Sequence, residues 1–243
     1  MIKYFTLKVL NIFDFFHQKK IIKFLRKKGF KNFNIFLDVG AHKGESINLF
    51  LKNFKIKTIY SFEASPITFK LLSDKIVFFR NKFKSSKLII ENYAIGAVEQ
   101  KVLLKQLQES SSSTIRNLNV NSKYFKKKRF FLLDDKKDSF FKEIEIQQIK
   151  LSNYLIKNNI DNVDFLKIDT EGYELEVLIG AKEMLSKINI ILFEHHYDDM
   201  ITKNYKFYDI HNFLLTNHFT QVYKIKMPFR KTFEYIYINK SKK

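Results

Sequence analysis

From residue 34 onward the sequence alternates between short apolar runs typical of buried strands and longer runs whose apolar residues recur at helical spacing. The strand-like runs are 34–39, 58–62, 87–94, 163–168 and 188–193, and the helix-like runs are 45–53, 66–79, 173–185 and 208–215. A less regular middle, 98–150, and a closing pair of strands, 218–225 and 232–238, complete the pattern. Strands that alternate with helices form a parallel sheet, because the connection between parallel strands has to cross over the sheet. The sequence therefore predicts an α/β fold with covering helices.

The composition sets the size of the fold and the classes of site that it can carry. The chain has 243 residues, of which 45% are hydrophobic, enough for one large core. It contains no cysteine, so disulfides, a thiolate nucleophile and a cysteine-based zinc site are excluded. Lysine and arginine outnumber aspartate and glutamate by 44 to 25, which gives a formal charge of +19. This charge would attract nucleic acid or anionic lipid, but a lysine-rich composition spread along the whole chain is an equally good explanation.

Residues 1–29 differ from the rest of the chain. Apolar residues recur at helical spacing over 2–16, and a basic block follows over 19–28. This predicts one or two amphipathic helices in an N-terminal extension, residues 1–30, ahead of the main domain, residues 31–243. The apolar run is shorter than the roughly 18 residues of a membrane span, and no secretory cleavage site follows it. We expect a cytoplasmic protein whose first helix either caps the core or lies peripherally on the inner face of a membrane.

The first strand carries Asp38 and runs directly into a loop with two glycines, Gly40 and Gly44, and then into a helix. In an α/β sheet the ligand binds beyond the carboxyl ends of the strands, where a glycine turn lets the backbone approach it closely. The segment FLDVGAHKGE lacks the spacing of a nucleoside triphosphate loop, in which a lysine follows the second glycine. It also lacks the middle glycine of a dinucleotide loop, because position 42 is histidine. Neither kind of phosphate site fits.

Two carboxylates at strand ends favour a cationic ligand instead. Asp38 beside the loop would repel a pyrophosphate and would attract a cation or accept a hydrogen bond from an amine. Glu63 ends the second strand in YSFEASP, where an acid can accept from ribose hydroxyls, although it could also cap the helix that begins at Pro66. A ligand with an ammonium, a sulfonium and a ribose but no phosphate suits both acids. S-adenosylmethionine is such a molecule.

Five segments form a joint pattern that is far more specific than any one of them. They are FLDVGAHKGE, SFEASP, NYAIG, the serine tract 110–113 and FLKIDTEGYELEVLIGA, in this order along the chain. Over about residues 34–195 this combination resembles the FkbM-type methyltransferase family. The resemblance implies a Rossmann-like class I fold: a mostly parallel seven-stranded sheet with an antiparallel C-terminal strand and helices on both faces. It also implies S-adenosylmethionine as cofactor and O-methylation of a hydroxyl, often on a sugar.

The resemblance implies a role for each matching residue near the cofactor. The first loop would shape the methionine end, Glu63 would hold the ribose, and the end of the third strand would lie beside the adenine. The loop residues are Asp38, Gly40, Ala41 and Gly44, and those of the third strand are Asn92 and Ala94. One departure is His42, where members of the family usually have asparagine. An imidazole N–H could replace the amide donor.

The same pattern places acidic residues after the fourth strand, across from the cofactor, where the acceptor would lie. Transfer to a hydroxyl needs an aligned oxygen, exclusion of water and a base that takes the proton. Histidine suits neutral pH without tuning, although a histidine pair could equally have a surface or capping role. Candidates for catalysis are Asp169, His195 and His196, and candidates for binding the acceptor are Glu171, Glu194, Ser111 and Ser112. The two serines count only if their tract is a loop over the acceptor and not a linker.

The carboxylates after the fourth strand have other readings. They could cap the following helix, or bind a divalent metal together with a histidine, but we expect no metal site.

The predicted function is O-methylation of a sugar hydroxyl in a glycan or glycolipid, with a small molecule or glycan as partner. One rival is methylation of RNA, which the charge favours, although no RNA-binding module is recognisable and we expect no nucleic-acid partner. A rival of another class is a non-catalytic protein that binds nucleic acid or membrane and has kept the fold.

Overall fold

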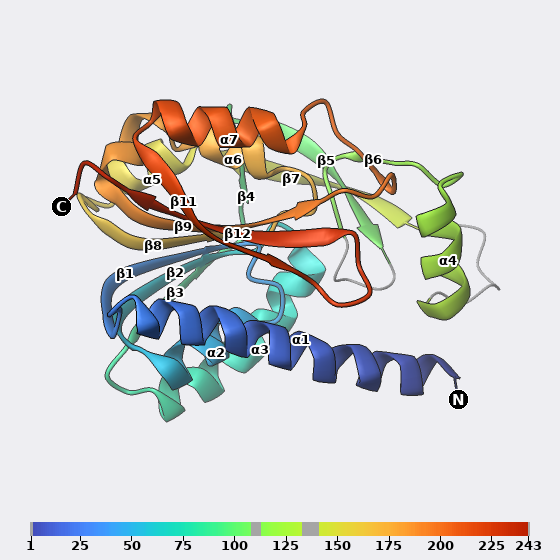
Figure 1. Ribbon diagram of the computed structural model, residues 1–243, viewed down its shortest axis with the longest axis horizontal. Helices are drawn as coiled ribbons and strands as arrows, with labels where there is room; N and C mark the ends of the chain where they lie inside the picture. Colours follow the sequence, from blue (N-terminus) through green and yellow to red (C-terminus); the bar gives the residue numbers. More distant parts are fainter. Residues whose placement is uncertain (1, 108–112, 133–140, 243) are drawn as a thin grey trace.

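A computed structural model describes residues 2–107, 113–132 and 141–242. Its centre is a seven-stranded sheet in the order β11-β12-β9-β8-β1-β2-β3 (Figure 1). The strands are β1 (Asn32–Val39), β2 (Lys55–Phe62), β3 (Lys87–Glu91), β8 (Val163–Ile168), β9 (Ile188–His196), β11 (Phe219–Lys226) and β12 (Thr232–Asn239). Strand β12 is antiparallel to both of its neighbours, and the pairs from β9 to β3 are all parallel. The predicted mostly parallel seven-stranded sheet with an antiparallel C-terminal strand is confirmed.

Helices cover both faces of this sheet, as predicted (Figure 1). On one face lie α1 (Ile2–Lys27), α2 (Glu45–Asn53) and α3 (Pro66–Lys82), and on the other α5 (Leu151–Lys157), α6 (Glu174–Gly180) and α7 (Phe207–Thr216). Side chains alternate between the two faces along β1, so this strand contributes to both cores. Phe36 packs with the first group of helices and Leu37 with the second. The two layers leave the carboxyl ends of the parallel strands at one edge.

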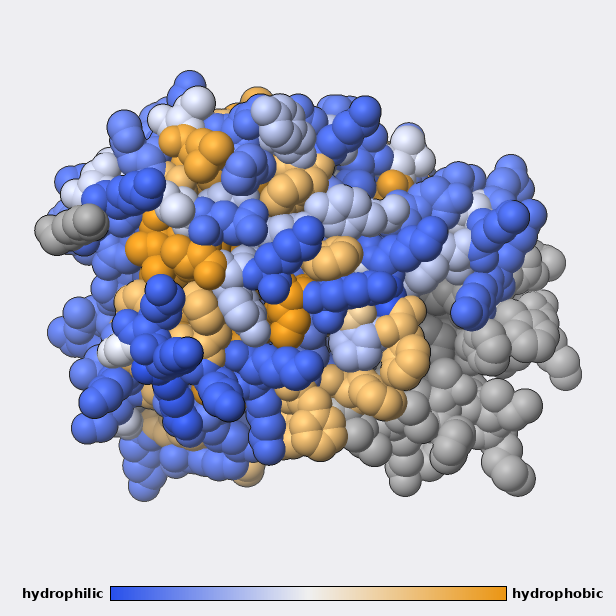
Figure 2. Space-filling view, in the orientation of Figure 1, coloured by the Kyte–Doolittle hydropathy of each residue, from blue (hydrophilic) through white to orange (hydrophobic). Residues whose placement is uncertain are grey.

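The first helix is a single element whose second half belongs to the core. Ile21, Ile22 and Leu25 are buried with the residues of α2 and α3. Gly29 follows in a left-handed conformation, φ 91°, which ends the helix. Nearer the N-terminus of α1, exposed hydrophobic side chains lie among hydrophilic ones (Figure 2). Of the described helices, none is long and apolar enough to cross a membrane. The predicted boundary at residue 30 stays a prediction.

The irregular middle forms a second, smaller layer beside the sheet. Strands β4 (Ala94–Ile95), β7 (Phe141–Ile149) and β5 (Gln100–Leu107) make a three-stranded sheet, and β6 (Asn117–Leu118) pairs with β10 (Ile201–Thr202). Helix α4 (Lys123–Leu132) follows β6. The sequence predicted one strand over 87–94, but β3 ends at Glu91 and Ala94 pairs with β7 in the smaller sheet.

The helix predicted over 173–185 is interrupted in the middle. Helix α6 ends at Gly180, and Lys182–Lys187 form a separate 3-10 helix. A Cβ atom on Gly180 would lie 2.0 Å from the backbone oxygen of Gly96, so this turn of helix lies directly against the loop after β4. The close approach explains why a glycine, a weak helix former, stands inside the predicted helix.

Candidate active site

A cavity of about 1910 Å³ opens beyond the carboxyl ends of the parallel strands. Ligand pockets commonly measure roughly 300–1,000 Å³, so this one has room for a cofactor and an acceptor together. Predicted residues that line it are Gly40, Ala41, Glu63, Ala94, Asp169, Glu171, Glu194 and His196. Within the described part of the chain, the wall does not include Asp38, Gly44, Asn92 or His195. Ser111 and Ser112 lie outside the described residues.

The loop after β1 is held flat against the ends of the neighbouring strands. The backbone N–H groups of Gly40 and Ala41 both donate to the oxygen of Phe62, at 2.9 and 3.0 Å. Gly40 has φ 85°, and a Cβ atom there would lie 1.8 Å from the backbone oxygen of Asp169. Only glycine fits this position, because both the conformation and the contact exclude a side chain. The loop therefore offers bare backbone to the cavity.

Two further loop residues have left-handed backbone, Gly44 with φ 82° and His42 with φ 48°. Asparagine and histidine are among the side chains that tolerate this region best, which gives a physical reason why one can replace the other here. The Nδ1 atom of the His42 ring lies 3.3 Å from a carboxylate oxygen of Glu45, at the start of α2. The ring therefore also contacts α2 and is not directed only at the cavity.

Glu63 sits where the loops after β1 and β2 meet. Its two carboxylate oxygens accept backbone N–H groups from His42, at 2.8 Å, and from Ser65, at 2.9 Å. Burial raises the pKa of Glu63, against these two bonds, which lower it. An ionised carboxylate has about four acceptor positions, so Glu63 can accept further hydrogen bonds from the cavity. This arrangement fits the two hydroxyls of a ribose.

Asn92 lies behind this glutamate and not in the cavity wall. Its side-chain N–H₂ donates to the backbone oxygens of Glu63, at 2.7 Å, and Ala64, at 3.2 Å. Asn92 therefore fixes the turn that carries Glu63, while its neighbour Ala94 lines the cavity.

The strand ends of β1 and β8 share a buried charge that the sequence interpretation missed. Lys167 Nζ lies 2.9 Å from Asp169 Oδ2 and 3.8 Å from Asp38 Oδ1. Asp38 is fully buried, and within the described residues neither of its oxygens accepts a hydrogen bond. Burial raises the pKa of Asp38 to about 6, although Lys167 acts against it. Burial also acts to raise the pKa of Asp169, but Lys167 outweighs it and the pKa lies below its usual value.

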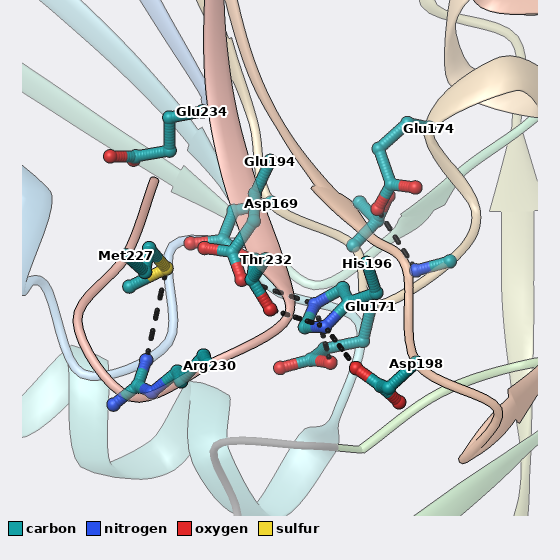
Figure 3. Close-up of polar contacts among 12 residues, drawn as sticks. Asp169, Glu171, Glu174, Glu194, His196, Asp198, Met227, Arg230, Thr232 and Glu234 are labelled. Carbon is teal, nitrogen blue, oxygen red and sulfur yellow. Dashed lines mark hydrogen bonds and ion pairs between the residues drawn. The ribbon is translucent and has the colours of Figure 1, made fainter. Parts of the chain in front are cut away.

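On the far side of the cavity, His196 lies in a cluster of carboxylates (Figure 3). Its Nε2 is 3.1 Å from Glu171 Oε2 and 3.1 Å from Glu194 Oε1, and its Nδ1 is 3.5 Å from Asp198 Oδ2. Burial acts to lower the pKa of His196, but these acids raise it well above its usual value. This shift favours the imidazolium form of His196, whereas the base role suggested by the sequence needs the neutral ring.

Glu194 has the opposite character. Burial, helped by the charge of Asp169, raises the pKa of Glu194 to about 7, although His196 acts against the shift. A carboxylate with this pKa can take a proton near neutral pH. Pairs of titratable groups whose pKa values are pushed apart mark acid and base roles in active sites. The arrangement can thus hold a polyhydroxyl ligand and accept a proton from it.

His195 is not brought to this cluster. Consecutive side chains of a strand point to opposite faces, so His195 and His196 cannot both face the cavity. The His195 ring packs against Tyr197, Tyr205 and Phe207 at centroid distances of 4.8, 6.0 and 5.8 Å. Burial lowers its pKa to about 3. His195 is a neutral member of an aromatic cluster.

Two residues from the irregular middle fix the loop that carries Glu171. Thr114 Oγ1 donates to the backbone oxygen of Glu171 at 2.7 Å, and Arg116 Nε donates to that of Gly172 at 3.1 Å. Both loop residues have left-handed backbone, with φ 49° and 90°. The sequence offers no signal for these contacts, which join residues 57 and 56 positions apart. Among the described residues, no group of three or more histidines and acids is arranged to hold a metal ion.

The family model of the methyltransferase FkbM domain matches residues 38–223, more than half of the chain. A solved methyltransferase FkbM from Methylobacillus flagellatus KT is 15% identical, with a TM-score of 0.56 over 85% of this chain and 43% of that one. This chain thus spans less than half of that structure. Magnesium protoporphyrin IX methyltransferase from Synechocystis PCC 6803 with bound S-adenosylmethionine is 10% identical, with a TM-score of 0.53 over 96% of this chain and 82% of that one. No curated protein matches the sequence. By its family match the chain belongs to the FkbM methyltransferases.

Proposed function

We propose that the protein methylates a sugar hydroxyl of a glycan or glycolipid. As an FkbM methyltransferase it uses S-adenosylmethionine. The observation that carries the choice of a hydroxyl acceptor is the pair formed by Glu194 and His196, a carboxylate with a pKa of about 7 beside a cationic imidazole in the cavity wall.

The residues around the first loop fit the cofactor. Glu63 would accept from the ribose hydroxyls, the backbone of Gly40 and Ala41 would pass along the methionine part, and Ala94 would lie beside the adenine. When bound, S-adenosylmethionine supplies a methyl group made electrophilic by positive sulfur. The acids at this edge of the sheet suit a cation and disfavour a phosphate.

On the acceptor side, the hydroxyl has to lose one proton, and residues of this chain can accept it. Glu194 would accept the proton of the acceptor hydroxyl on a carboxylate oxygen when the hydroxyl oxygen is methylated. His196 remains protonated and keeps Glu194 ionised enough to act, because the imidazolium lowers the pKa of this acid. Asp169, held by Lys167 at 2.9 Å, would accept from a second hydroxyl and orient the acceptor.

The charge of the cavity floor favours a neutral polyhydroxyl acceptor over a phosphate-rich one. Asp169, Glu171, Glu194 and Asp198 gather at the reacting end. Carboxylates accept hydrogen bonds from hydroxyls, whereas a phosphodiester brought among them would be repelled. A sugar therefore suits this end of the cavity better than RNA does, even though the whole chain carries a charge of +19.

Two measurements test the proposal. Calorimetry should detect S-adenosylmethionine binding to the purified protein, and mass spectrometry should find glycans in producing cells that are heavier by one methyl group. Incubation with labelled S-adenosylmethionine and total RNA from the same cells supplies the competing arm. Label in RNA without any methylated glycan would overturn the choice of acceptor, while absence of cofactor binding would overturn the whole proposal.

A further inference from the structure

We infer that the surface around the cavity mouth docks on an anionic membrane. The surface, called here the aromatic patch, consists of Phe13, Phe15 and Phe16 of α1 and Phe229 of the turn between β11 and β12. The inference does not depend on which acceptor is methylated, because it rests on side chains outside the reacting end.

The patch is held together by contacts between α1 and the turn. The rings of Phe13 and Phe229 meet edge to face at 4.8 Å, and Arg230 pairs with Asp14 at 2.8 Å. Despite these contacts the rings are open to solvent: the exposed fractions are 37%, 51% and 56% for Phe13, Phe15 and Phe16, and 75% for Phe229. Large aromatic residues that stand exposed side by side mark a binding surface.

This patch borders the entrance to the site. Phe15 and Phe229 line the cavity together with Arg230 and Lys231 of the same turn. Figure 2 shows exposed hydrophobic side chains where α1 passes the tip of the β11–β12 hairpin, with strongly hydrophilic ones around them. A membrane bound here would lie across the route by which an acceptor reaches the reacting end.

The charges around the rings select the kind of partner. On α1 the next residues after the rings include Lys19, Lys20 and Lys23, all exposed, and Lys19 Nζ lies 4.2 Å from the centroid of the Phe15 ring. Helix α4, which contacts α1, contributes Lys123 and Lys127 to the cavity wall. Aromatic rings that enter the headgroup region, with lysines beside them that meet anionic lipid, are the two features by which helices bind membrane surfaces.

Other partners fit the patch less well. A second copy of the chain would bring the same lysines against each other, because a twofold contact pairs each patch with itself. Single-stranded RNA stacks its bases on flat aromatic faces, but the ring pairs here are steeply inclined, at 84° for Phe13 with Phe229 and 66° for Phe15 with Phe16.

The test is flotation of the full chain with vesicles of phosphatidylcholine alone or with about one third phosphatidylglycerol, at low and high salt. The wild type should float with the anionic vesicles only, and less at high salt. Replacing both exposed rings, Phe16→Ser with Phe229→Ser, should lower partitioning by about tenfold or more. Removing three charges, Lys19→Gln, Lys20→Gln and Lys23→Gln, should do the same at low salt.

Matched controls separate the patch from general stickiness. Phe78→Ser removes a ring of α3 that is 60% exposed and also has a lysine over it, Lys82 at 5.5 Å. The three exposed lysines Lys157, Lys182 and Lys187 serve as the charge-matched control when changed together to Gln. Both controls should stay within about twofold of the wild type. If the double serine variant does not fold, Phe16→Ser alone gives the same comparison.

Four results would overturn the inference. They are equal binding to neutral vesicles, equal losses in the control variants, a dimer in ultracentrifugation that the ring substitutions dissolve, and RNA binding that they abolish.

Discussion

The two ends of the cavity are built differently. At the end where we propose that the cofactor binds, the polar contacts are made by backbone groups of short turns, as when the N–H groups of His42 and Ser65 hold Glu63. At the acceptor end they are made by side chains from separate strands, as when Thr232 of β12 lies 3.1 Å from His196 of β9. A cofactor is the same molecule in every turnover, so fixed backbone groups can bind it. A proton transfer needs titratable groups with opposed pKa values, which only side chains provide.

The largest expected effect is a loss of turnover that leaves cofactor binding unchanged. Glu194→Gln keeps the size of the side chain and removes the proton acceptor, so kcat should fall by about a hundredfold or more. The Kd for S-adenosylmethionine from calorimetry should not change, because Glu194 lies at the other end. In the wild type kcat should rise with pH through about 7, since the ionised form of Glu194 is the active one. Survival of turnover in this variant would make Asp169 the better base.

The same substitution has a consequence for stability. Because the folded protein raises the pKa of Glu194 from 4.5 to about 7, it holds this proton more tightly than the unfolded chain does. The stability that results is fully present below about pH 4.5 and is lost as the pH rises through about 7. The Tm of the wild type should therefore fall as the pH rises through this window, and Glu194→Gln should make the fall smaller. Identical melting profiles would contradict the raised pKa.

At the cofactor end, the largest expected effect is on the backbone of the first loop. Gly40→Ala places a Cβ atom 1.8 Å from the Asp169 backbone oxygen, in a residue with φ 85°. Gly29→Ala is the matched control, with φ 91° and no atom within 4 Å of the added Cβ. The control should lower Tm by about 2–4 °C, as expected for roughly 1 kcal/mol in a domain of this size. Gly40→Ala should lower Tm further and raise the Kd for S-adenosylmethionine about tenfold or more. Equal effects of the two would mean that the loop can move away.

Glu63→Gln tests the side chain at the same end. It removes a charge that would accept from ribose hydroxyls, so the Kd for S-adenosylmethionine should rise about tenfold or more, with kcat at saturation unchanged. The control is Glu91→Gln at the end of β3, whose carboxylate accepts from the Tyr154 hydroxyl and does not line the cavity in the described structure. Unchanged affinity in Glu63→Gln would remove the ribose role.

Local spacing along the sequence predicted which strand ends meet at the cavity, but not every side chain that lines it, for a physical reason. Strand, glycine turn and helix are local patterns, so the positions of Gly40 and Glu63 could be read from spacing. The gathering of Asp169 and Glu194 could also be expected, because parallel strands end at one edge of the sheet. What spacing cannot supply is the contact made across the fold. The charge of Lys167 between two acids depends on how β1 and β8 pair.

The choice between two adjacent histidines illustrates the same limit. Alternation along β9 shows that His195 and His196 face opposite sides of the sheet, but not which of them faces the ligand. That is decided by register, which sets Thr232 of β12 beside His196, and by the helix that covers the other face, whose Phe207 packs on His195.

A smaller effect is expected from His196 itself. His196→Gln removes the cation that lowers the pKa of Glu194, so the rise of kcat with pH should move upward by about one unit. Cofactor affinity should stay the same. His211→Gln is the control, because that ring pairs with the Tyr237 hydroxyl at 2.7 Å and lies outside the described cavity wall. A pH profile that does not move would show that the two side chains act independently.

The smallest effect should come from Asn92, which would act on cofactor binding only through the backbone of the turn that carries Glu63. Asn92→Ala removes two hydrogen bonds to the turn, at 2.7 and 3.2 Å, and leaves the carboxylate in place. Since a neutral hydrogen bond contributes about 1 kcal/mol, we expect the Kd for S-adenosylmethionine to rise by about three- to tenfold, with kcat unchanged. Asn153→Ala, which loses one bond to Glu99 at an exposed site, should leave the Kd unaltered. A loss as large as that of Glu63→Gln would mean that the turn, and not the carboxylate, determines affinity at the cofactor end.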